Sequence, residues 1–142
     1  MSYCEECGTE LIPRELENEG IIPYCPHCNQ FRFPKYNVAV SMIVINRAED
    51  KILLIQQYGR PFFILVAGYV SRTEELEHAA ARELKEETGM TAESVHFNRS
   101  HFFEPSNTLM CNFTVFVKDD SEMNPNSEID IRAAFIRATS IA

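Results

Sequence analysis

The sequence predicts a mixed-sheet α/β domain preceded by a small zinc ribbon. Three observations indicate this fold class: two Cys-x-x-Cys pairs near the start, apolar strand-like runs on both sides of residue 70, and one strong helical pattern between those runs. Strands before and after a single helix are typical of α+β or mixed-sheet α/β domains. We therefore expect a ribbon over residues 1–36 and a second domain over residues 37–142.

The first four cysteines have the spacing of a zinc site. Cys4 and Cys7 form one pair, Cys25 and Cys28 form the other, and seventeen residues separate the pairs. This spacing is typical of a structural Zn²⁺ ion bound by four thiolates, with disulfides or free thiols as the alternative. Residues 1–36 hold six glutamates against three basic residues, a composition that disfavours nucleic-acid binding. We therefore interpret the ribbon as a structural clip, with a protein-docking module as the alternative.

Apolar runs predict the strands of the second domain. Residues rich in β-branched and apolar side chains, bounded by polar turns, favour strands. The expected strands cover residues 38–46, 51–57, 62–66, 96–103, 109–117 and, near the end, 133–136. The polar residues 47–50 make the first two strands a hairpin. Cys111 lies in an apolar run and is interpreted as a small core residue.

The helical pattern after residue 74 carries carboxylates on its packing side. At about 100° per residue, Leu76 and Ala80 align with Glu83 and Glu87, and Glu86 lies within roughly the same 100° arc. Carboxylates directed at a protein interior are costly unless they are paired or bind a metal. A solvated, glutamate-rich helix surface is the alternative.

A bound cation resolves this excess of negative charge. Arg82 is the basic residue close by, and one guanidinium cannot neutralise three carboxylates. Mg²⁺ and Mn²⁺ take oxygen ligands and keep positions open for water and phosphate. The pattern therefore predicts a divalent metal site, and Gly89 is expected to end the helix as a left-handed cap.

The same stretch matches the defining positions of the Nudix box, so the chain resembles a Nudix hydrolase. The matching positions are Gly68, Glu74, Arg82, Glu83, Leu84, Glu86, Glu87, Gly89 and Met90. The resemblance implies an α/β/α sandwich with a mixed sheet, and metal-dependent hydrolysis of a diphosphate that joins a nucleoside to another group. The last expected strand lies close to residue 142, so the second helix of that sandwich is expected to be missing.

The flanks of the box are similar to the NADH pyrophosphatase branch of this family. The four-cysteine ribbon precedes the box, and the bridge F-R-F-P-K-Y connects the two. Where that branch carries S-Q-P-W-P-F-P-x-S-L-M, this chain reads S-H-F-F-E-P-S-N-T-L-M and agrees at Ser100, Leu109 and Met110. The agreement is partial, so the substrate stays open.

The resemblance also implies roles for individual residues. Glu83 and Glu87 would be the main ligands of Mg²⁺ or Mn²⁺, with Glu86, the carbonyl of Ala67 and Glu128 completing the site. Arg82 would orient the glutamates, so the implied catalytic set is Arg82, Glu83, Glu86, Glu87 and Glu128. The implied substrate-binding residues are Phe33, Tyr69, His101, Phe102 and Phe103, where a core position is an equal alternative for the last two.

These inferences predict a pyrophosphohydrolase that acts on a small nucleoside diphosphate derivative. The favoured substrate is a dinucleotide such as NADH or NAD, which would give AMP and a mononucleotide. The alternatives are ADP-ribose, FAD or a nucleoside triphosphate, or a non-catalytic nucleotide-sensing module. Relatives are often dimers, and Phe62 with Phe63 would suit the interface of a homodimer.

The composition and charge of the chain indicate which partners it can bind and where in the cell it is expected. A formal net charge of −8 over 142 residues disfavours nucleic acid, because phosphate binding depends on lysine and arginine. The sequence has no run of about 18 apolar residues, and residues 1–7 do not resemble a signal peptide. We expect a cytoplasmic protein that does not bind membranes.

Overall fold

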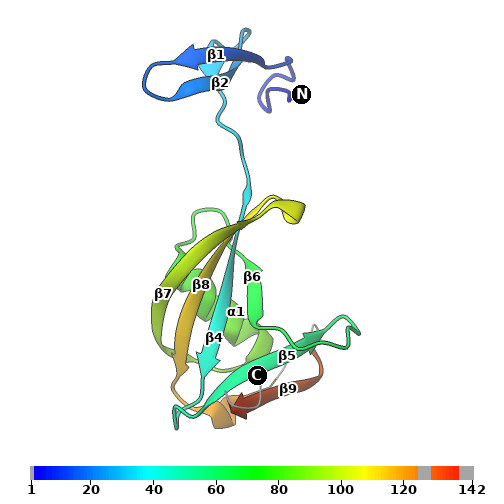
Figure 1. Cartoon of the computed structure of the whole chain (residues 1–142), viewed down its shortest axis with the longest axis vertical. Helices are drawn as coiled ribbons and strands as arrows, with labels where there is room; N and C mark the ends of the chain where they lie inside the picture. Colours follow the sequence, from blue (N-terminus) through cyan, green and yellow to red (C-terminus); the bar gives the residue numbers. More distant parts are fainter. Residues whose placement is uncertain (1, 125–128, 138–142) are drawn as a thin grey trace. The chain divides into compact units, whose positions relative to one another are not determined.

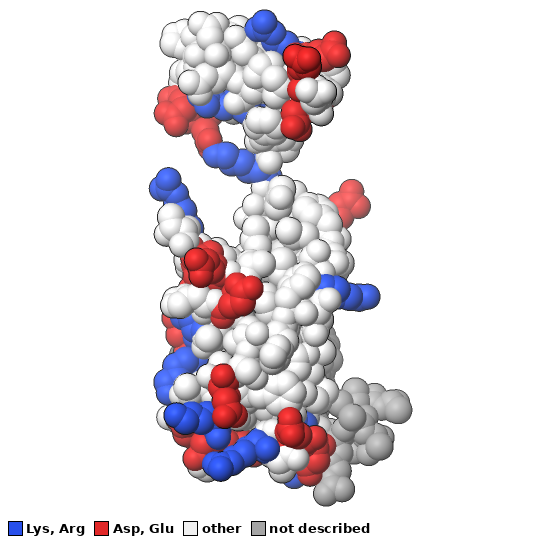
Figure 2. Space-filling view, turned by 90° about the vertical axis from the view of Figure 1, so that its left-hand side faces the viewer, with Lys and Arg blue, Asp and Glu red and all other residues white. Residues whose placement is uncertain are grey.

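Two compact units divide the chain, Met1–Tyr36 and Asn37–Ala142 (Figure 1). The structure is a computed structural model, and it describes residues 2–124 and 129–137. On the face drawn in Figure 2, the described lysine and arginine side chains are interspersed with aspartate and glutamate and form no continuous basic patch. This distribution agrees with the net charge of −8.

The first unit is a three-stranded antiparallel sheet built around cysteines. Its strands are β1 (Ile12–Leu16), β2 (Gly20–Cys25) and β3 (Gln30–Phe31), in the order β1-β2-β3. Among the described residues of this unit, Cys4 and Cys25 are the buried apolar side chains. A segment of this size cannot bury enough apolar surface to be stable by itself, so the cysteine cluster takes the place of a hydrophobic core.

The second unit contains a six-stranded mixed sheet. The strands are β4 (Asn37–Ile45), β5 (Lys51–Gln57), β6 (Val66–Tyr69), β7 (Ala92–Phe103), β8 (Thr108–Val117) and β9 (Ile129–Arg137). Their order is β7-β8-β4-β5-β9, and β6 pairs with β4. The β4–β8 pair is parallel, whereas the other pairs are antiparallel. The predicted mixed sheet is therefore confirmed.

One face of this sheet forms the core against α1 (Leu76–Thr88), as Figure 1 shows. Successive side chains of a strand point to opposite faces. Accordingly, β4 buries Val40, Met42 and Val44, and β8 buries Phe113 and Val115. The apolar runs of the sequence therefore correspond to strands in which every second side chain is buried in the core.

A single α-helix, α1, is present among residues 2–124 and 129–137. It contributes Ala79, Ala80 and Leu84 to the core, all of them buried. The helix has 13 residues. Within the described residues, no helix combines the length and the hydropathy that a membrane span requires.

The prediction of a strand over residues 62–66 is wrong. Strand β6 begins only at Val66, while Phe62 and Phe63 are 51% and 41% exposed. Ile64 makes an isolated antiparallel bridge to Ile55. Pro61 has no N–H to donate to a sheet, so the preceding turn leads into a loop instead of a ladder.

Candidate active site and zinc site

The last two turns of helix α1 carry Glu83, Glu86 and Glu87 and lie at one end of the core. Gly89 ends the helix with φ 78°, and its N–H donates to the carbonyl of Lys85, which confirms the predicted left-handed cap. Thr88 is buried, and its hydroxyl donates to the Leu84 carbonyl over 2.6 Å. Fixing the last turn in this way also fixes the direction of Glu87.

Glu83, Glu86 and Glu87 line one cavity of about 320 Å³. Glu87 is 3% exposed as a residue, and the side chain of Glu83 is 14% exposed. The side chain of Glu86 is 56% exposed and lies at the rim, farther toward solvent than the packing-side prediction places it. The cavity therefore has two deep carboxylates and one outer carboxylate.

Strand β6 forms the wall of this cavity opposite the helix. Its pairing with β4 sets Gly68 beside Val40, and Ala67 and Gly68 both line the cavity. A Cβ atom added to Gly68 would collide with the carboxylate of Glu83. Only glycine leaves room for the carboxylate at this point, so the box glycine has a steric explanation.

Arg82 connects the carboxylates to one another. Its Nε and Nη2 atoms donate to the two oxygens of Glu74 over 2.6 and 2.9 Å, a bidentate arrangement. Its Nη1 atom donates to Glu83 over 2.9 Å and to Glu86 over 3.1 Å. Nη2 also donates to the carbonyl of Tyr69 over 3.1 Å, which ties the helix to β6. Arg82 thus has the geometry of a residue that orients the glutamates.

The pairing of Glu74 predicts a loss of stability in acid. The guanidinium of Arg82, followed by the N–H of Ser71, holds the pKa of Glu74 well below its usual range. A glutamate in the unfolded chain has a pKa of about 4.3. The stabilisation is therefore complete above that pH, and it is lost as the pH falls from there through the lower pKa of Glu74 in the folded protein.

We expect Glu74→Gln to lower the Tm at pH 7 and to make the Tm less sensitive to pH below about 5. Calorimetric scans between neutral and acid pH measure both effects. Glu77→Gln is the matched control, because Glu77 is an exposed glutamate in the first turn of α1, close to Glu74 in the sequence. A Glu74→Gln protein that keeps the acid sensitivity of the wild type would contradict this account.

Two further residues line the cavity that were not predicted from the sequence, Gln57 and Tyr58. On β5, Leu53 and Ile55 are buried, and Gln57 is the next residue in the same alternation. Its Nε2 atom donates to Oε1 of Glu87 over 3.4 Å. A run of apolar, core-facing positions that ends in a polar residue could have indicated Gln57 from the sequence. The glutamates of the helix were predicted from the same kind of pattern.

The predicted substrate-binding residues of the second unit divide into two groups. Tyr69 lines the glutamate cavity and is 59% exposed. His101, Phe102 and Phe103 lie at the far end of β7, paired with β8, and are not among the residues that line this cavity. The core interpretation of Phe102 and Phe103 is wrong, because they are 50% and 48% exposed. Glu128 lies outside the described residues.

The four cysteines of the first unit converge on one point. Their sulfur atoms all lie within 4.8 Å of one another, with 4.0 Å between Cys4 and Cys28 and 3.5 Å between Cys7 and Cys25. Thiolates bound to one zinc ion at about 2.3 Å lie roughly 3.8 Å apart, so the cluster fits a tetrahedral zinc site. Gly8, with φ 78°, turns the chain after the first pair and donates its N–H to the Cys4 carbonyl over 2.8 Å.

The charges around these sulfurs also fit a bound cation. The backbone N–H of Cys7 and the guanidinium of Arg32 lower the pKa of Cys4 to about 6. The side chain of Cys7 and burial raise the pKa of Cys28 to about 12. The side chain of Thr9 also lowers the pKa of Cys7, so the cluster stabilises the thiolates of Cys4 and Cys7 and resists the ionisation of Cys28. A bound zinc ion would supply the positive charge that lets all four thiols ionise.

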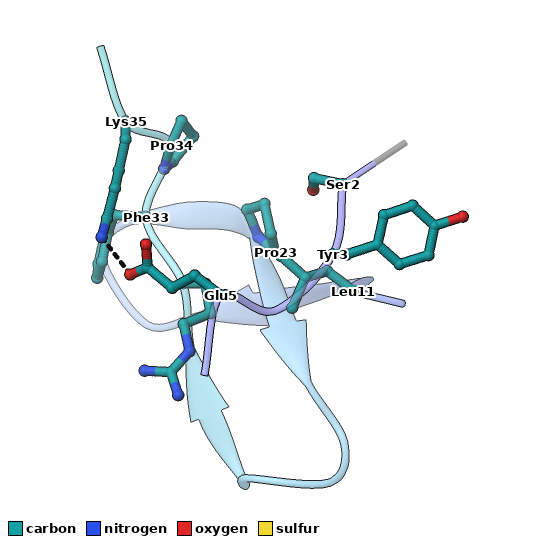
Figure 3. A pocket seen from close by; sticks show the side chains of 9 residues that line it. Ser2, Tyr3, Glu5, Leu11, Pro23, Phe33, Pro34 and Lys35 are labelled. Atoms are coloured by element: carbon teal, nitrogen blue, oxygen red, sulfur yellow. Dashed lines mark hydrogen bonds and ion pairs between the residues drawn. The ribbon is translucent and has the colours of Figure 1, made fainter. Parts of the chain in front are cut away.

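A second cavity, of about 360 Å³, lies within the first unit (Figure 3). Its walls include Leu11, Pro23 and Pro34, and the aromatic side chains of Tyr3 and Phe33 line it as well. An ion pair between Lys35 and Glu5 lies at this cavity, as the dashed line in Figure 3 shows. Phe33, a predicted substrate-binding residue, is 52% exposed and therefore accessible to a ligand.

Fold and site together define a mixed-sheet α/β domain that presents a carboxylate cavity beside a helix end. A family model described as the NUDIX domain matches residues 35–141. The chain therefore belongs to the Nudix family of pyrophosphohydrolases. Membership implies a divalent metal ion and substrates that are nucleoside diphosphate derivatives, and the four-cysteine cluster has the ligand set of a zinc site.

Curated relatives agree with this membership. A protein of Photobacterium profundum described as "NAD-capped RNA hydrolase NudC" is 31% identical over 130 residues, which cover 89% of this chain and 46% of that protein. The protein of the same description from Shigella dysenteriae serotype 1 is 33% identical over 119 residues, covering 82% of this chain and 43% of the relative. The chain thus spans less than half the length of these relatives.

Solved structures show the same fold. A Nudix hydrolase from Nitrosomonas europaea has a TM-score of 0.66 at 24% sequence identity, and the match covers 98% of this chain and 79% of that protein. The Nudix domain of Shewanella oneidensis NrtR, solved with ADP ribose, has a TM-score of 0.62 at 16% identity, covering 83% of this chain and 80% of that one. At these identities the similarity concerns the fold alone.

Proposed function

We propose that residues 37–142 hydrolyse the diphosphate of a nucleoside diphosphate derivative, with a dinucleotide such as NADH or NAD as the favoured substrate. The products would be AMP and a mononucleotide. The observation that carries the proposal is the cavity lined by Glu83, Glu86 and Glu87. The similarity to proteins described as NAD-capped RNA hydrolases supports the choice of an NAD-type dinucleotide.

The proposed Mg²⁺ or Mn²⁺ site consists of oxygen donors. Glu83 and Glu87 are the principal ligands, Glu86 joins from the rim, and the carbonyl of Ala67 belongs to the same set because Ala67 lines the cavity. Glu128 is proposed as a further ligand from the sequence. Oxygen donors of this kind suit hard cations, and an ion held by these residues would neutralise charge on the diphosphate.

A carboxylate of the same cluster would act as the general base. Glu87 or Glu83 takes a proton from the water that attacks one phosphorus atom in line, and Arg82 holds Glu83 in position. One general base contributes about 10²- to 10⁴-fold to the rate, so positioning and charge neutralisation must supply most of the acceleration.

Aromatic residues are proposed to bind the nucleoside. Tyr69 is the strongest of them, because it is exposed at the glutamate cavity. Phe33 of the first unit and the β7 residues His101, Phe102 and Phe103 are proposed as further contacts. A base stacked on an aromatic ring gains about 1 to 3 kcal/mol.

Product analysis tests the proposed function. The chain is incubated separately with NADH, NAD, ADP-ribose and FAD, each with Mg²⁺ or Mn²⁺, and chromatography measures the AMP released. We expect AMP from the dinucleotides. AMP from ADP-ribose alone would reassign the substrate, and no AMP from any of the four would reject the proposed substrate class.

The Glu87→Gln protein serves as the control for contaminating hydrolases. Equal AMP release by this variant and by the wild type would show that the activity does not belong to this cavity. An added nucleoside triphosphate, with detection of inorganic phosphate and pyrophosphate, covers the remaining alternative.

A further inference from the structure

Tyr58 has a backbone conformation that its residue type disfavours. Its φ is 55°, and Gly59 follows with φ 68°. The N–H of Arg60 donates to the carbonyl of Gln57 over 3.1 Å, which closes a tight turn with positive φ at both central residues. This pattern is that of a type I′ turn, where Asn-Gly is the preferred pair. Tyrosine is therefore disfavoured at the first central position of this turn.

Three of the other positive-φ residues are asparagines, whose type suits the conformation better. Among the described residues, the other non-glycine residues with positive φ are Asn18, Asn29, Glu49, Thr73 and Asn107. Asparagine is enriched in this region because its short polar side chain bonds locally. Tyr58 is the aromatic member of the group. A strained residue that the surrounding structure maintains is an indication of function when it lies at a site.

The position of the ring shows what that function can be. Tyr58 is 69% exposed, so burial in the core does not account for the aromatic side chain. It lines the same cavity as the three glutamates, as Tyr69 does from β6. The turn after β5 and the end of β6 therefore each contribute one exposed tyrosine to the lining of the carboxylate cavity.

We propose that Tyr58 is a substrate-binding residue whose ring stacks on the aromatic base of the nucleoside diphosphate derivative. The inference rests on the proposed function. The carboxylates, with their cation, account for the diphosphate, and the planar base can stack on more than one of the aromatic residues that line the cavity, Tyr58 and Tyr69. An uncharged aromatic face suits such a base, because every base has a π-face and stacking needs no particular hydrogen-bonding pattern.

Tyr58→Asn separates this role from a structural role. Asparagine followed by Gly59 is the preferred pair for the turn, so the variant is expected to have a Tm equal to or above that of the wild type. Loss of the ring is expected to raise KM for NADH or ADP-ribose about tenfold or more, with kcat changed by less than about threefold. Tyr58→Phe keeps the ring and is expected to stay within about threefold of the wild type in KM.

Glu49→Asn is the matched control for relief of backbone strain. Glu49 has φ 58° and lies in the turn between β4 and β5, and it is not among the residues lining the glutamate cavity. We expect this variant to gain stability and to keep the wild-type KM. Calorimetric binding of ADP-ribose without added metal gives a second measurement that does not depend on turnover. It is expected to show the same weakening for Tyr58→Asn.

The outcomes distinguish the two proposals. Normal turnover by the wild type together with an unchanged KM and unchanged ADP-ribose binding in Tyr58→Asn would overturn the role of Tyr58 and leave the proposed function standing. A loss in Tyr58→Phe as large as that in Tyr58→Asn would overturn stacking in favour of the hydroxyl group. A wild-type protein that neither hydrolyses nor binds these nucleotides would overturn both proposals.

Discussion

Replacing Glu87 by glutamine is expected to lower kcat by more than about 10²-fold and to leave the fold intact. Glu87 is 3% exposed, and Gln57 donates to its Oε1 atom over 3.4 Å. Glutamine has nearly the same shape but carries no charge and accepts no proton. The variant therefore loses both roles proposed for this carboxylate, metal ligand and general base.

Stability and metal affinity separate these roles from a folding defect. A buried carboxylate is costly in the absence of a cation, so we expect the metal-free Glu87→Gln protein to have a Tm at least equal to that of the wild type. Its affinity for Mn²⁺, measured by electron paramagnetic resonance, should fall. Glu77→Gln removes an exposed glutamate from the same helix and should change neither quantity. Near-wild-type turnover by Glu87→Gln would reject the proposed role.

Replacing Cys25 by serine is expected to abolish zinc binding and to unfold residues 1–36. Cys25 is fully buried, and its sulfur lies 3.5 Å from that of Cys7. Structural zinc sites supply about 10 to 16 kcal/mol of apparent binding free energy at neutral pH. In a unit whose buried apolar residues are Cys4 and Cys25, within its described part, little else can stabilise the fold.

Elemental analysis and backbone NMR spectra measure this effect. We expect about one zinc ion per wild-type chain and none in Cys25→Ser, with the amide signals of residues 2–36 collapsing to the unfolded range. Cys111→Ala is the matched control, because Cys111 is a buried cysteine of the second unit, outside the cluster. Zinc retained by Cys25→Ser at the wild-type level would show that the cluster does not bind it.

The helix and its glutamates are predictable from the sequence because their signals are local. The stripe from Leu76 to Glu87 depends only on the angular spacing of helical residues, and Gly89 ends the helix for reasons of backbone geometry. Both features take shape within about 15 residues of chain. The four cysteines are predictable for a similar reason, because their spacing within each pair limits the metal geometry.

The burial of several aromatic side chains could not be predicted from the sequence, because it depends on how distant strands pair. The run at Phe62 and Phe63 has the composition of a strand, but Pro61 and the turn before it prevent a ladder. Phe102 and Phe103 also read equally well as core residues, yet their β7 positions leave them half exposed. Apolar character predicts burial only where another element covers the side chain, and a local pattern does not contain that information.

The carboxylates, Arg82 and the two box glycines belong to one short segment, so local spacing was enough to predict the candidate metal site of the second unit. Which other residues share the cavity depends on how the chain folds. Gln57 and Tyr58 reach the glutamates because β5 and α1 pack on the same core, about 30 residues apart along the chain. Side-chain spacing along one element is set by backbone geometry, whereas contacts between elements are set by packing, so the second wall of the site appears only in the folded protein.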